Sequence, residues 1–300
     1  GLVVVNTNPL YTPRELEHQL KDSGAGTIIV LENFANTLEL VLPRTQVKNV
    51  IIAKMGDMFG TIKGGIMNFV LRHIKKMVPG YHIANAIPFK QVLAQGAKQP
   101  FTPVDLTRED LAFLQYTGGT TGVAKGAMLT HGNICANMLQ GGEWIKHKLT
   151  PGQETVIAAL PMYHIFALTV NLLLFFQAGA KSILITNPRD LDGFIEELKK
   201  HPVSVFIGLN TLFRGLLNKP AFHQVNFSTW KLSLGGGMAT QQAVAEEWFK
   251  TVGIPVVDAY GLTEASPGVC VNPLNVKDYS GGIGLPLPNT EVQLRDGRGG

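Results

Sequence analysis

A glycine- and threonine-rich segment with one lysine is the part of the sequence best suited to chemistry. Residues 116–126 read Tyr-Thr-Gly-Gly-Thr-Thr-Gly-Val-Ala-Lys-Gly. Glycines let backbone amides turn toward a bulky anion, threonine hydroxyls donate to phosphate oxygens, and a lysine adds a positive charge. The pattern therefore predicts a phosphate-binding loop made of Thr117, Gly118, Gly119, Thr120, Thr121, Gly122 and Lys125.

This loop differs from a Walker A loop, which has glycine immediately before the lysine and serine or threonine after it. Here Ala124 precedes Lys125 and Gly126 follows it. The flanking residues 111–116 and 127–129 have the apolar character of strands, and Thr130 is placed to cap a helix. We therefore expect the loop to join two strands.

Polar and glycine residues also follow two further strand-like runs. Asp258, Tyr260, Thr263 and Glu264 come directly after the apolar run that ends at Val257. The turn Gly235, Gly236, Gly237 follows residues 231–234 and precedes a helix. Because ligands bind at the carboxyl ends of parallel strands, both segments are candidate binding sites. A surface carboxylate and a simple strand-to-helix turn are the alternatives.

A histidine lies in the segment Pro-Met-Tyr-His-Ile-Phe at residues 161–166, which ends another strand-like run. A lone histidine among apolar residues is more often a core residue than a catalyst. The residues alone leave the role of His164 open.

The string Tyr-Thr-Gly-Gly-Thr-Thr-Gly-Val-Ala-Lys-Gly-Ala-Met-Leu-Thr-His-Gly-Asn from Tyr116 resembles the phosphate-binding signature of the adenylate-forming superfamily. This superfamily includes acyl-CoA synthetases, peptide-synthetase adenylation domains and luciferases. Gly119 and Ala124 stand where serine or threonine and proline are usual, which resembles the bacterial long-chain fatty acyl-CoA synthetase branch. Further motifs follow in family order over about residues 1–295.

The resemblance implies a role for each site residue. Tyr260 stacks on adenine, Asp258 accepts from its amino group, and the glycines of residues 235–237 lie against it. Thr263 contacts the α-phosphate, Glu264 helps hold Mg²⁺, and His164 shapes the entrance for the acyl substrate. Catalytic residues by this resemblance are Lys125, Thr263, Glu264 and His164.

The implied reaction has two halves. A fatty acid carboxylate attacks the α-phosphate of ATP to give acyl-AMP, and coenzyme A then takes the acyl group. The expected fold is α/β, an N-terminal core of layered, mostly parallel sheets flanked by helices. We expect one truncated ATP- and acyl-binding domain over residues 1–300, without a separate second domain. A ribose-binding aspartate, an adenylation lysine and the small C-terminal domain are expected outside it, so the chain alone is expected to be inactive.

Composition excludes several other classes. Apolar residues make up 45% and charged residues 16%, which is typical of a globular protein. The net charge of +4 is too small and scattered to indicate nucleic-acid binding. Two cysteines, Cys135 and Cys270, without a Cys-x-x-Cys pair predict neither a zinc site nor a disulfide framework, and favour a cytoplasmic setting. Oligomeric state cannot be read from the residues.

Alternating strand and helix patterns support the α/β interpretation. A capping box at residues 12–15 predicts a helix to about Asp22, and a β-branched strand follows at residues 27–31. We expect residues 2–5 to form a buried strand parallel to it, completing a βαβ unit. Residues 166–180 predict a buried helix, because amides interrupt a run too short to cross a bilayer.

The segment 62–77 combines apolar residues at helical spacing with lysines, an arginine and a histidine. A basic amphipathic helix can lie in an anionic membrane interface, which would place the protein peripherally on the cytoplasmic membrane. We favour the alternative, a surface helix packed on the domain with a solvated basic face.

Two other functions remain open. An amino-acid or aryl-acid adenylation enzyme of the same superfamily would need a small polar pocket, which the apolar stretch after His164 argues against. A non-catalytic nucleotide- or lipid-binding module would use the same loop or the basic helix without chemistry.

Overall fold

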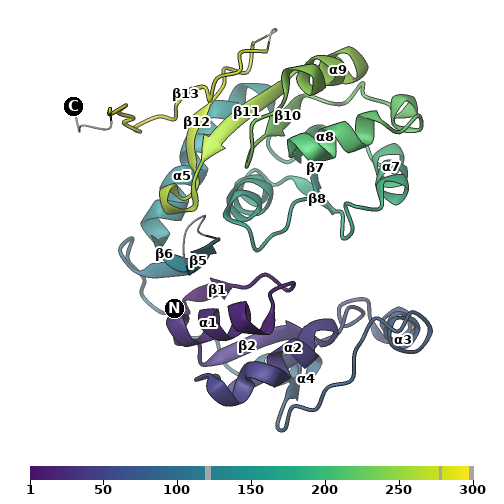
Figure 1. Cartoon of the computed structure of the whole chain (residues 1–300), viewed down its shortest axis with the longest axis vertical. Helices are drawn as coiled ribbons and strands as arrows, with labels where there is room; N and C mark the ends of the chain where they lie inside the picture. The colour runs from purple at the N-terminus through teal and green to yellow at the C-terminus, as the bar shows by residue number, and fades with distance from the viewer. Residues whose placement is uncertain (119–122, 277–278, 297–300) are drawn as a thin grey trace. The chain divides into compact units, whose positions relative to one another are not determined.

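The computed structural model describes residues 1–118, 123–276 and 279–296 (Figure 1). The chain forms two compact units: Gly1–Leu106 with Tyr116–Gly126, and Thr107–Gln115 with Ala127–Gly300. Strands β5 (Leu111–Thr117) and β6 (Lys125–Thr130) are neighbours in one sheet, and each runs from one unit into the other. The two strands flank the glycine- and threonine-rich segment, as predicted.

The first unit contains a parallel sheet of β2 (Thr27–Leu31), β3 (Asn49–Ala53) and β4 (Ile87–Pro88). Helix α1 (Pro13–Ser23) begins with the predicted capping box, in which Thr12 and Glu15 bond reciprocally. It ends at Gly24, whose φ of 64° suits glycine. The unit's other helical segments are η1 (Glu32–Phe34), α2 (Ala35–Val41), η2 (Leu42–Arg44), α3 (Thr61–Phe69), η3 (Val70–Ile74) and α4 (Phe89–Gly96).

The predicted βαβ unit at the start of the chain is wrong. Strand β1 (Val4–Asn6) joins β5 and β6 in a separate three-stranded sheet, while β2 pairs with β3. Its segment is not buried either, because Leu2 is 88% exposed and Val3 is 44% exposed. Hydrophobicity identified the strand, but apolar character alone does not specify which neighbour a strand pairs with.

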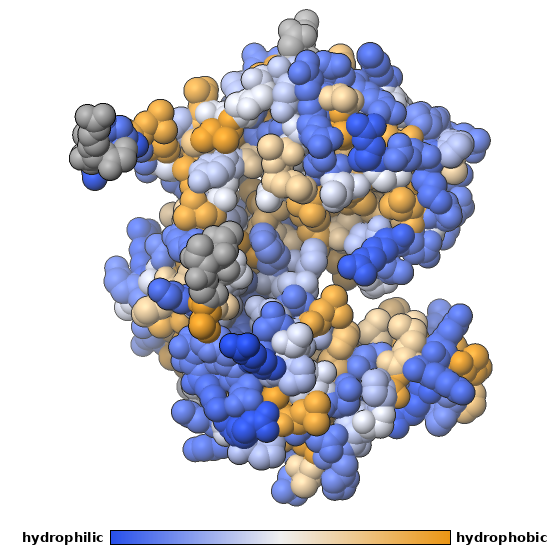
Figure 2. All heavy atoms as spheres, in the orientation of Figure 1, coloured by the Kyte–Doolittle hydropathy of each residue, from blue (hydrophilic) through white to orange (hydrophobic). Residues whose placement is uncertain are grey.

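Helices α3 and η3 contact the rest of the unit through Asn68 and Arg72, which bond to Gly56 and Glu32, but most of their apolar side chains are exposed rather than packed as expected. Ile62 is 79% exposed, Ile66 61% and Phe69 59%. Only Gly64 of α3 is buried, and it contacts the backbone of Gly56 so closely that an added Cβ would lie 2.1 Å from the Gly56 carbonyl oxygen. Figure 2 shows hydrophobic and hydrophilic spheres interleaved over this part of the surface.

The second unit is built on a seven-stranded sheet with the order β13-β12-β11-β10-β9-β7-β8. Strands β8 to β11 and β7 are mutually parallel, and β12 and β13 are added antiparallel at one edge. The strands are β7 (Thr155–Ala158), β8 (Lys181–Leu184), β9 (Val205–Gly208), β10 (Leu232–Gly235), β11 (Val256–Gly261), β12 (Gly268–Val271) and β13 (Leu285–Pro286).

Helices cover both faces of this sheet, so the second unit has three layers (Figure 1). Alternate strand residues point to opposite faces: Ile157 and Phe206 join one core, and Val156 and Val205 join the other. Helices α7 (Leu191–Lys200), α8 (Asn210–Leu217) and α9 (Gln242–Val252) bury apolar residues in the first core. The second core includes α5 (His131–Ile145) and the wide π-type helix η5 (Ala167–Leu174).

The helix predicted at residues 166–180 is present as η5 and α6 (Phe175–Gln177), and it ends three residues earlier than predicted. Gln241 is the N-cap of α9, and the hydroxyl of the preceding Thr240 donates a hydrogen bond to Asp258. The remaining short segments are η4 (Lys146–Lys148), η6 (Phe222–Gln224) and η7 (Thr263–Ala265). Across residues 1–118, 123–276 and 279–296, every helix is too short or too polar to cross a lipid bilayer.

Candidate active site

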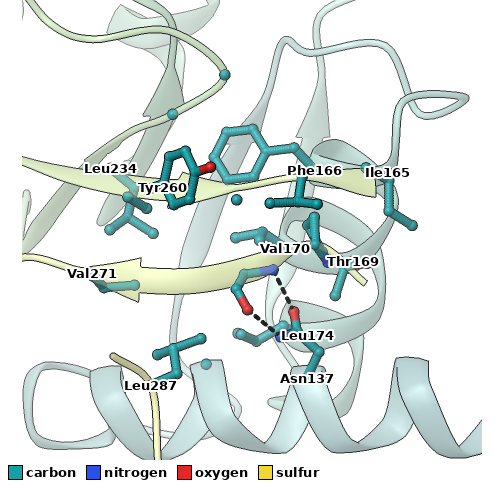
Figure 3. Close-up of a pocket in the computed structure, with 18 of the residues that line it drawn as sticks. Asn137, Ile165, Phe166, Thr169, Val170, Leu174, Leu234, Tyr260, Val271 and Leu287 are labelled. Atoms are coloured by element: carbon teal, nitrogen blue, oxygen red, sulfur yellow. Dashed lines mark hydrogen bonds between the residues drawn. The ribbon is translucent and has the colours of Figure 1, made fainter. Parts of the chain in front are cut away.

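The second unit contains an apolar pocket at the carboxyl ends of β10 and β11 (Figure 3). Side chains from η5, α5, β12 and the segment after β13 point into it, and polar groups gather where β11 ends. This is the sheet edge at which parallel α/β folds bind ligands. The apolar lining includes Trp144, Ile145, Ile165, Phe166, Val170, Leu174, Leu234, Val271 and Leu287.

The glycine turn after β10 is required by two close contacts and by one left-handed backbone conformation. A Cβ on Gly235 would lie 2.4 Å from the Asp258 carboxylate, and one on Gly236 would lie 2.8 Å from the Phe166 ring. Gly237 has a φ of 76°, which side chains rarely allow. Gly236 and Gly237 line the pocket. The turn is therefore more than a simple strand-to-helix connection, because it lets the backbone form the pocket wall.

Residues Tyr260 to Thr263 form the polar rim of the same pocket. Tyr260 is 43% exposed, so its ring is accessible to a flat ligand. Gly261 lies against Pro267, where a Cβ would come within 2.3 Å of the carbonyl oxygen. Glu264 follows in η7 with an exposed side chain. The structure thus groups Tyr260 and Thr263 with the glycine turn, as the sequence predicted.

His164 lines the pocket at the start of the helical segment that continues into η5. Its Nδ1 accepts a hydrogen bond from the Phe166 N–H at 3.3 Å. Desolvation by the surrounding chain lowers the pKa of His164 below its ordinary value. The imidazole is therefore neutral near pH 7 and carries its proton on Nε2.

Asp258 does not line this pocket. Its carboxylate accepts a hydrogen bond from the Thr240 hydroxyl and lies beside Gly235, and it borders a separate cavity with α9, Asn272 and Tyr279. Burial raises the pKa of Asp258, while its hydrogen bonds with Thr240 act in the opposite direction. The neighbouring Ala259 lines the apolar pocket instead.

The ends of the glycine- and threonine-rich segment lie in the first unit, and Gly119, Thr120, Thr121 and Gly122 are outside the described residues. Thr117 ends β5 and Lys125 begins β6 with an exposed side chain. Among the described residues, none comes within 4 Å of a Cβ added at Gly118. Within the described part of the chain, no carboxylate forms an ion pair with Lys125.

Among the residues that the structure describes, no three histidine, cysteine, aspartate or glutamate side chains are close enough to hold a metal ion. Glu264 nevertheless suits Mg²⁺, which is usually bound by one or two carboxylates together with substrate phosphates. Its exposed oxygens next to the pocket rim fit that arrangement.

Comparison with known proteins identifies the family. The family model described as "AMP-binding enzyme" matches residues 1–300. The chain belongs to this family. It is 54% identical over 296 residues to a long-chain-fatty-acid–CoA ligase of Escherichia coli O6:H1, covering 99% of this chain and 53% of that protein. A long-chain-fatty-acid–CoA ligase of Yersinia pestis is 53% identical over 299 residues, covering 100% of this chain and 53% of its own length.

Solved structures agree on the fold. The anthranilate CoA ligase AuaEII, crystallised with anthranoyl-AMP, superposes with a TM-score of 0.75 at 20% identity, covering 99% of this chain and 52% of that one. The α/β fold predicted from the sequence, that of the N-terminal core of an adenylate-forming enzyme, is therefore confirmed. The chain spans about half the length of the curated relatives it matches.

Sequence reasoning missed Asn137, a buried amide in the middle of α5 that lines the pocket. Its side chain accepts from the Gly268 N–H at 2.9 Å and donates to the Gly268 carbonyl at 2.8 Å (Figure 3). No local pattern marks it, because its partner is 131 residues away. The only available signal was an amide among apolar helix residues.

Proposed function

We propose that the full-length protein is an ATP-dependent long-chain-fatty-acid–CoA ligase, and that these residues are its truncated N-terminal domain, with the two units as parts of that domain. The observation that carries the proposal is the pocket, whose interior is apolar and whose rim carries Tyr260 and Thr263. An alkyl chain suits the interior, and a nucleotide suits the rim. The relatives' names and their identity of more than half support this substrate class.

The first half-reaction requires positioning and charge neutralisation. The carboxylate oxygen of the fatty acid forms a bond to the α-phosphorus of ATP, the bond to the β-phosphate oxygen breaks, and pyrophosphate leaves. We assign binding of the β- and γ-phosphates to Thr117, Gly118 and Lys125 with the undescribed Gly119, Thr120, Thr121 and Gly122. Thr263 is assigned to the α-phosphate and Tyr260 to adenine.

The remaining site residues have supporting roles. Mg²⁺, with Glu264 as a ligand, would supply charge neutralisation at the phosphates. Neutral His164 is assigned to the entrance for the acyl substrate, since its lowered pKa and its Nδ1 bond make it a poor cation at neutral pH. The absence of side chains at residues 235–237 leaves space for the adenylate. Asp258, whose carboxylate lies beside Gly235 and outside the pocket, is assigned an indirect role at the adenine end of the site through the glycine turn.

In the second half-reaction the thiol of coenzyme A attacks the acyl carbonyl, and AMP leaves. The carbon–sulfur bond forms as the carbon–oxygen bond to AMP breaks, and the thiol proton is released.

Fatty acid-dependent exchange of pyrophosphate into ATP by the full-length protein tests the first half-reaction. We expect Lys125→Ala or Glu264→Ala to lower the rate about 10²–10³-fold with little change in thermal stability, since each removes charge stabilisation. Lys148→Ala, an exposed lysine of η4, is the control and should leave the rate unchanged. A full-length protein that ignores ATP would overturn the proposal.

The same assay separates the fatty acid from an amino acid. Palmitate should drive exchange and small polar acids should not, because polar groups buried in this apolar pocket would lose their hydrogen bonds to water. Exchange driven by an amino acid or an aryl acid in preference to palmitate would instead support the alternative enzyme of this family. ATP binding without exchange would support a non-catalytic module.

We also propose that the protein is cytoplasmic and contacts the inner membrane surface through α3 and η3. The exposed apolar residues of this segment, together with the exposed Lys63, Lys75 and Lys76, support an interfacial position on anionic lipid. No acidic residue lies between residues 58 and 77 to oppose it.

Co-sedimentation with vesicles that contain anionic phospholipid tests this contact. Reversing the charges of Lys75 and Lys76 should weaken binding at least tenfold, since each lysine near such a surface contributes about 1 kcal/mol. Reversing Lys48 and Lys98, which are exposed elsewhere in the same unit, changes net charge equally and should have a smaller effect. Equal losses in both variants would reject a specific contact.

A further inference from the structure

One face of helix α1 contacts both strand ends that flank the glycine- and threonine-rich segment. His18 and Asp22 are four residues apart on α1 and therefore lie on the same side of it. His18 contacts Ala124, immediately before Lys125, and Asp22 contacts Tyr116, immediately before Thr117. All of these residues belong to the first unit.

The contact with β5 is a hydrogen bond from the Tyr116 hydroxyl to Asp22 Oδ2 at 2.6 Å. The Tyr116 side chain is buried, and burial raises the pKa of its hydroxyl, so the group stays protonated and donates. Its ring lies against Gly126 of β6, where an added Cβ would be 3.0 Å from the ring. Tyr116 therefore links α1 to both strands.

The contact with β6 is a hydrogen bond between His18 Nε2 and the Ala124 carbonyl oxygen at 2.7 Å. A carbonyl oxygen only accepts, so Nε2 must carry the proton. The His18 ring also meets the Tyr116 ring edge-on, with centroids 6.4 Å apart. The carbonyl fixed in this way belongs to the peptide whose N–H is that of Lys125.

We propose that His18 and Asp22 are positioning residues for nucleotide binding, which act by holding the backbone at Thr117 and Lys125. The inference rests on the proposed function, since it assigns these two residues to the triphosphate of ATP. The Lys125 side chain is exposed, and His18 holds the peptide from which this side chain would extend to the triphosphate. Holding that backbone in place before ATP arrives lowers the entropy lost on binding.

Steady-state pyrophosphate exchange with the full-length enzyme tests the proposal. His18→Ala should raise KM for ATP about tenfold, the effect of losing one hydrogen bond, and leave KM for the fatty acid within about twofold. His18→Gln keeps a donor at the position of Nε2 and should recover most of the loss. Asp22→Ala should behave like His18→Ala, and Asp22→Asn, which keeps an acceptor, should resemble wild type.

Arg14→Ala is the matched control, because Arg14 is an exposed residue of the same helix. It should leave both KM values unchanged. An unchanged KM for ATP in His18→Ala, equal rises in both KM values, or no recovery with glutamine would overturn the proposal.

Hydrogen–deuterium exchange of the nucleotide-free protein separates this idea from the proposed function. His18→Ala should exchange faster than wild type in peptides covering residues 124–130, whether or not the wild type uses ATP. If His18→Ala exchanges faster but the wild-type protein has no ATP activity, the contact with α1 is supported and only the proposed function is rejected. Unchanged exchange would reject the contact.

Discussion

At the scale of single residues, the half-buried carboxylate of Asp258 makes a testable difference to stability. Burial raises its pKa, so the folded protein holds this proton at a higher pH than the unfolded chain does. The stability gained from the protonated form is present at low pH and is lost as pH rises through the raised pKa. At pH 7 the folded state therefore carries an unfavourable, partly buried charge.

We predict that Asp258→Asn unfolds at the same or a higher temperature than wild type at pH 7. Its amide oxygen still accepts from the Thr240 hydroxyl, and the charge is gone. The advantage should shrink as pH falls toward about 4, the ordinary pKa of an aspartate. Thermal unfolding between pH 4 and 8 measures this.

Asp258→Ala provides the contrast, because it leaves the buried Thr240 hydroxyl without its acceptor and should cost about 1–3 kcal/mol. If the unfolding temperatures of Asp258→Asn and wild type differ by the same amount from pH 4 to pH 8, the raised pKa of Asp258 is contradicted.

His164 gives a second prediction, in which stability changes with pH in the direction opposite to that for Asp258. Because desolvation lowers its pKa, the unfolded chain binds this proton at a higher pH than the folded chain does. Stability should therefore fall as pH drops below about 6.5, the ordinary histidine pKa. We expect His164→Asn to lose less stability than wild type between pH 7.5 and 5.5 in urea unfolding. Parallel losses in the two proteins would show that His164 is not the group responsible.

At the scale of elements, α5 is attached to the edge of the sheet by side chains on one face. Asn137, Gln140 and Trp144 lie three and four residues apart and bond to backbone groups of Gly268, Pro288 and Asn272, respectively. Asn137 pairs with both the N–H and the carbonyl of Gly268, as a neighbouring strand would. These bonds hold two walls of the pocket together.

We predict that Asn137→Ala lowers the free energy of unfolding by about 2–4 kcal/mol, because two backbone groups lose their partners. Gln140→Ala should cost less, since its side chain bonds at the less buried end. Denaturant unfolding of the full-length protein measures both. A loss for Asn137→Ala no larger than that for Gln140→Ala would contradict the role of the paired amide.

Elements defined by local signals could be predicted from the sequence. Thr12 and Thr130 begin α1 and α5 through capping bonds to residues three positions on, while Gly24 ends α1 and Gly253 ends α9 with left-handed backbone. Non-local choices could not be predicted. The partner of β1 and the exposed side of α3 depend on contacts between distant residues, which periodicity does not encode.

Part of the candidate site could likewise be predicted from the sequence, and part could not. Glycine turns and strand ends identified Gly236, Gly237, Tyr260 and Thr263 as neighbours, because parallel strands bring their carboxyl ends together. Asp258 lies one residue before a pocket residue, and strand alternation turns its side chain away. His18, Asp22 and Asn137 act through partners 94 to 131 residues away, so no sequence spacing marks them.

At the scale of the whole molecule, the chain covers 53% of the length of its relatives in Escherichia coli and Yersinia pestis. Its two units contain the pocket and the ends of the glycine- and threonine-rich segment. The family resemblance assigns the ribose-binding aspartate and the adenylation lysine to residues outside these 300. We therefore expect this chain to bind nucleotide without catalysing the complete reaction.

We predict that residues 1–300 alone bind ATP or an acyl-adenylate weakly and form no measurable acyl-CoA. Each missing group that stabilises developing charge is expected to cost about 10²–10³ in rate, and two such losses multiply when they are independent. Calorimetric titration with a non-hydrolysable ATP analogue measures binding, and a thioester assay with palmitate and coenzyme A measures turnover. The full-length protein is the control and should be active in both. Robust thioester formation by the 300 residues would show that the activating groups lie within them, and the assignment of the lysine and aspartate to other residues would then be wrong.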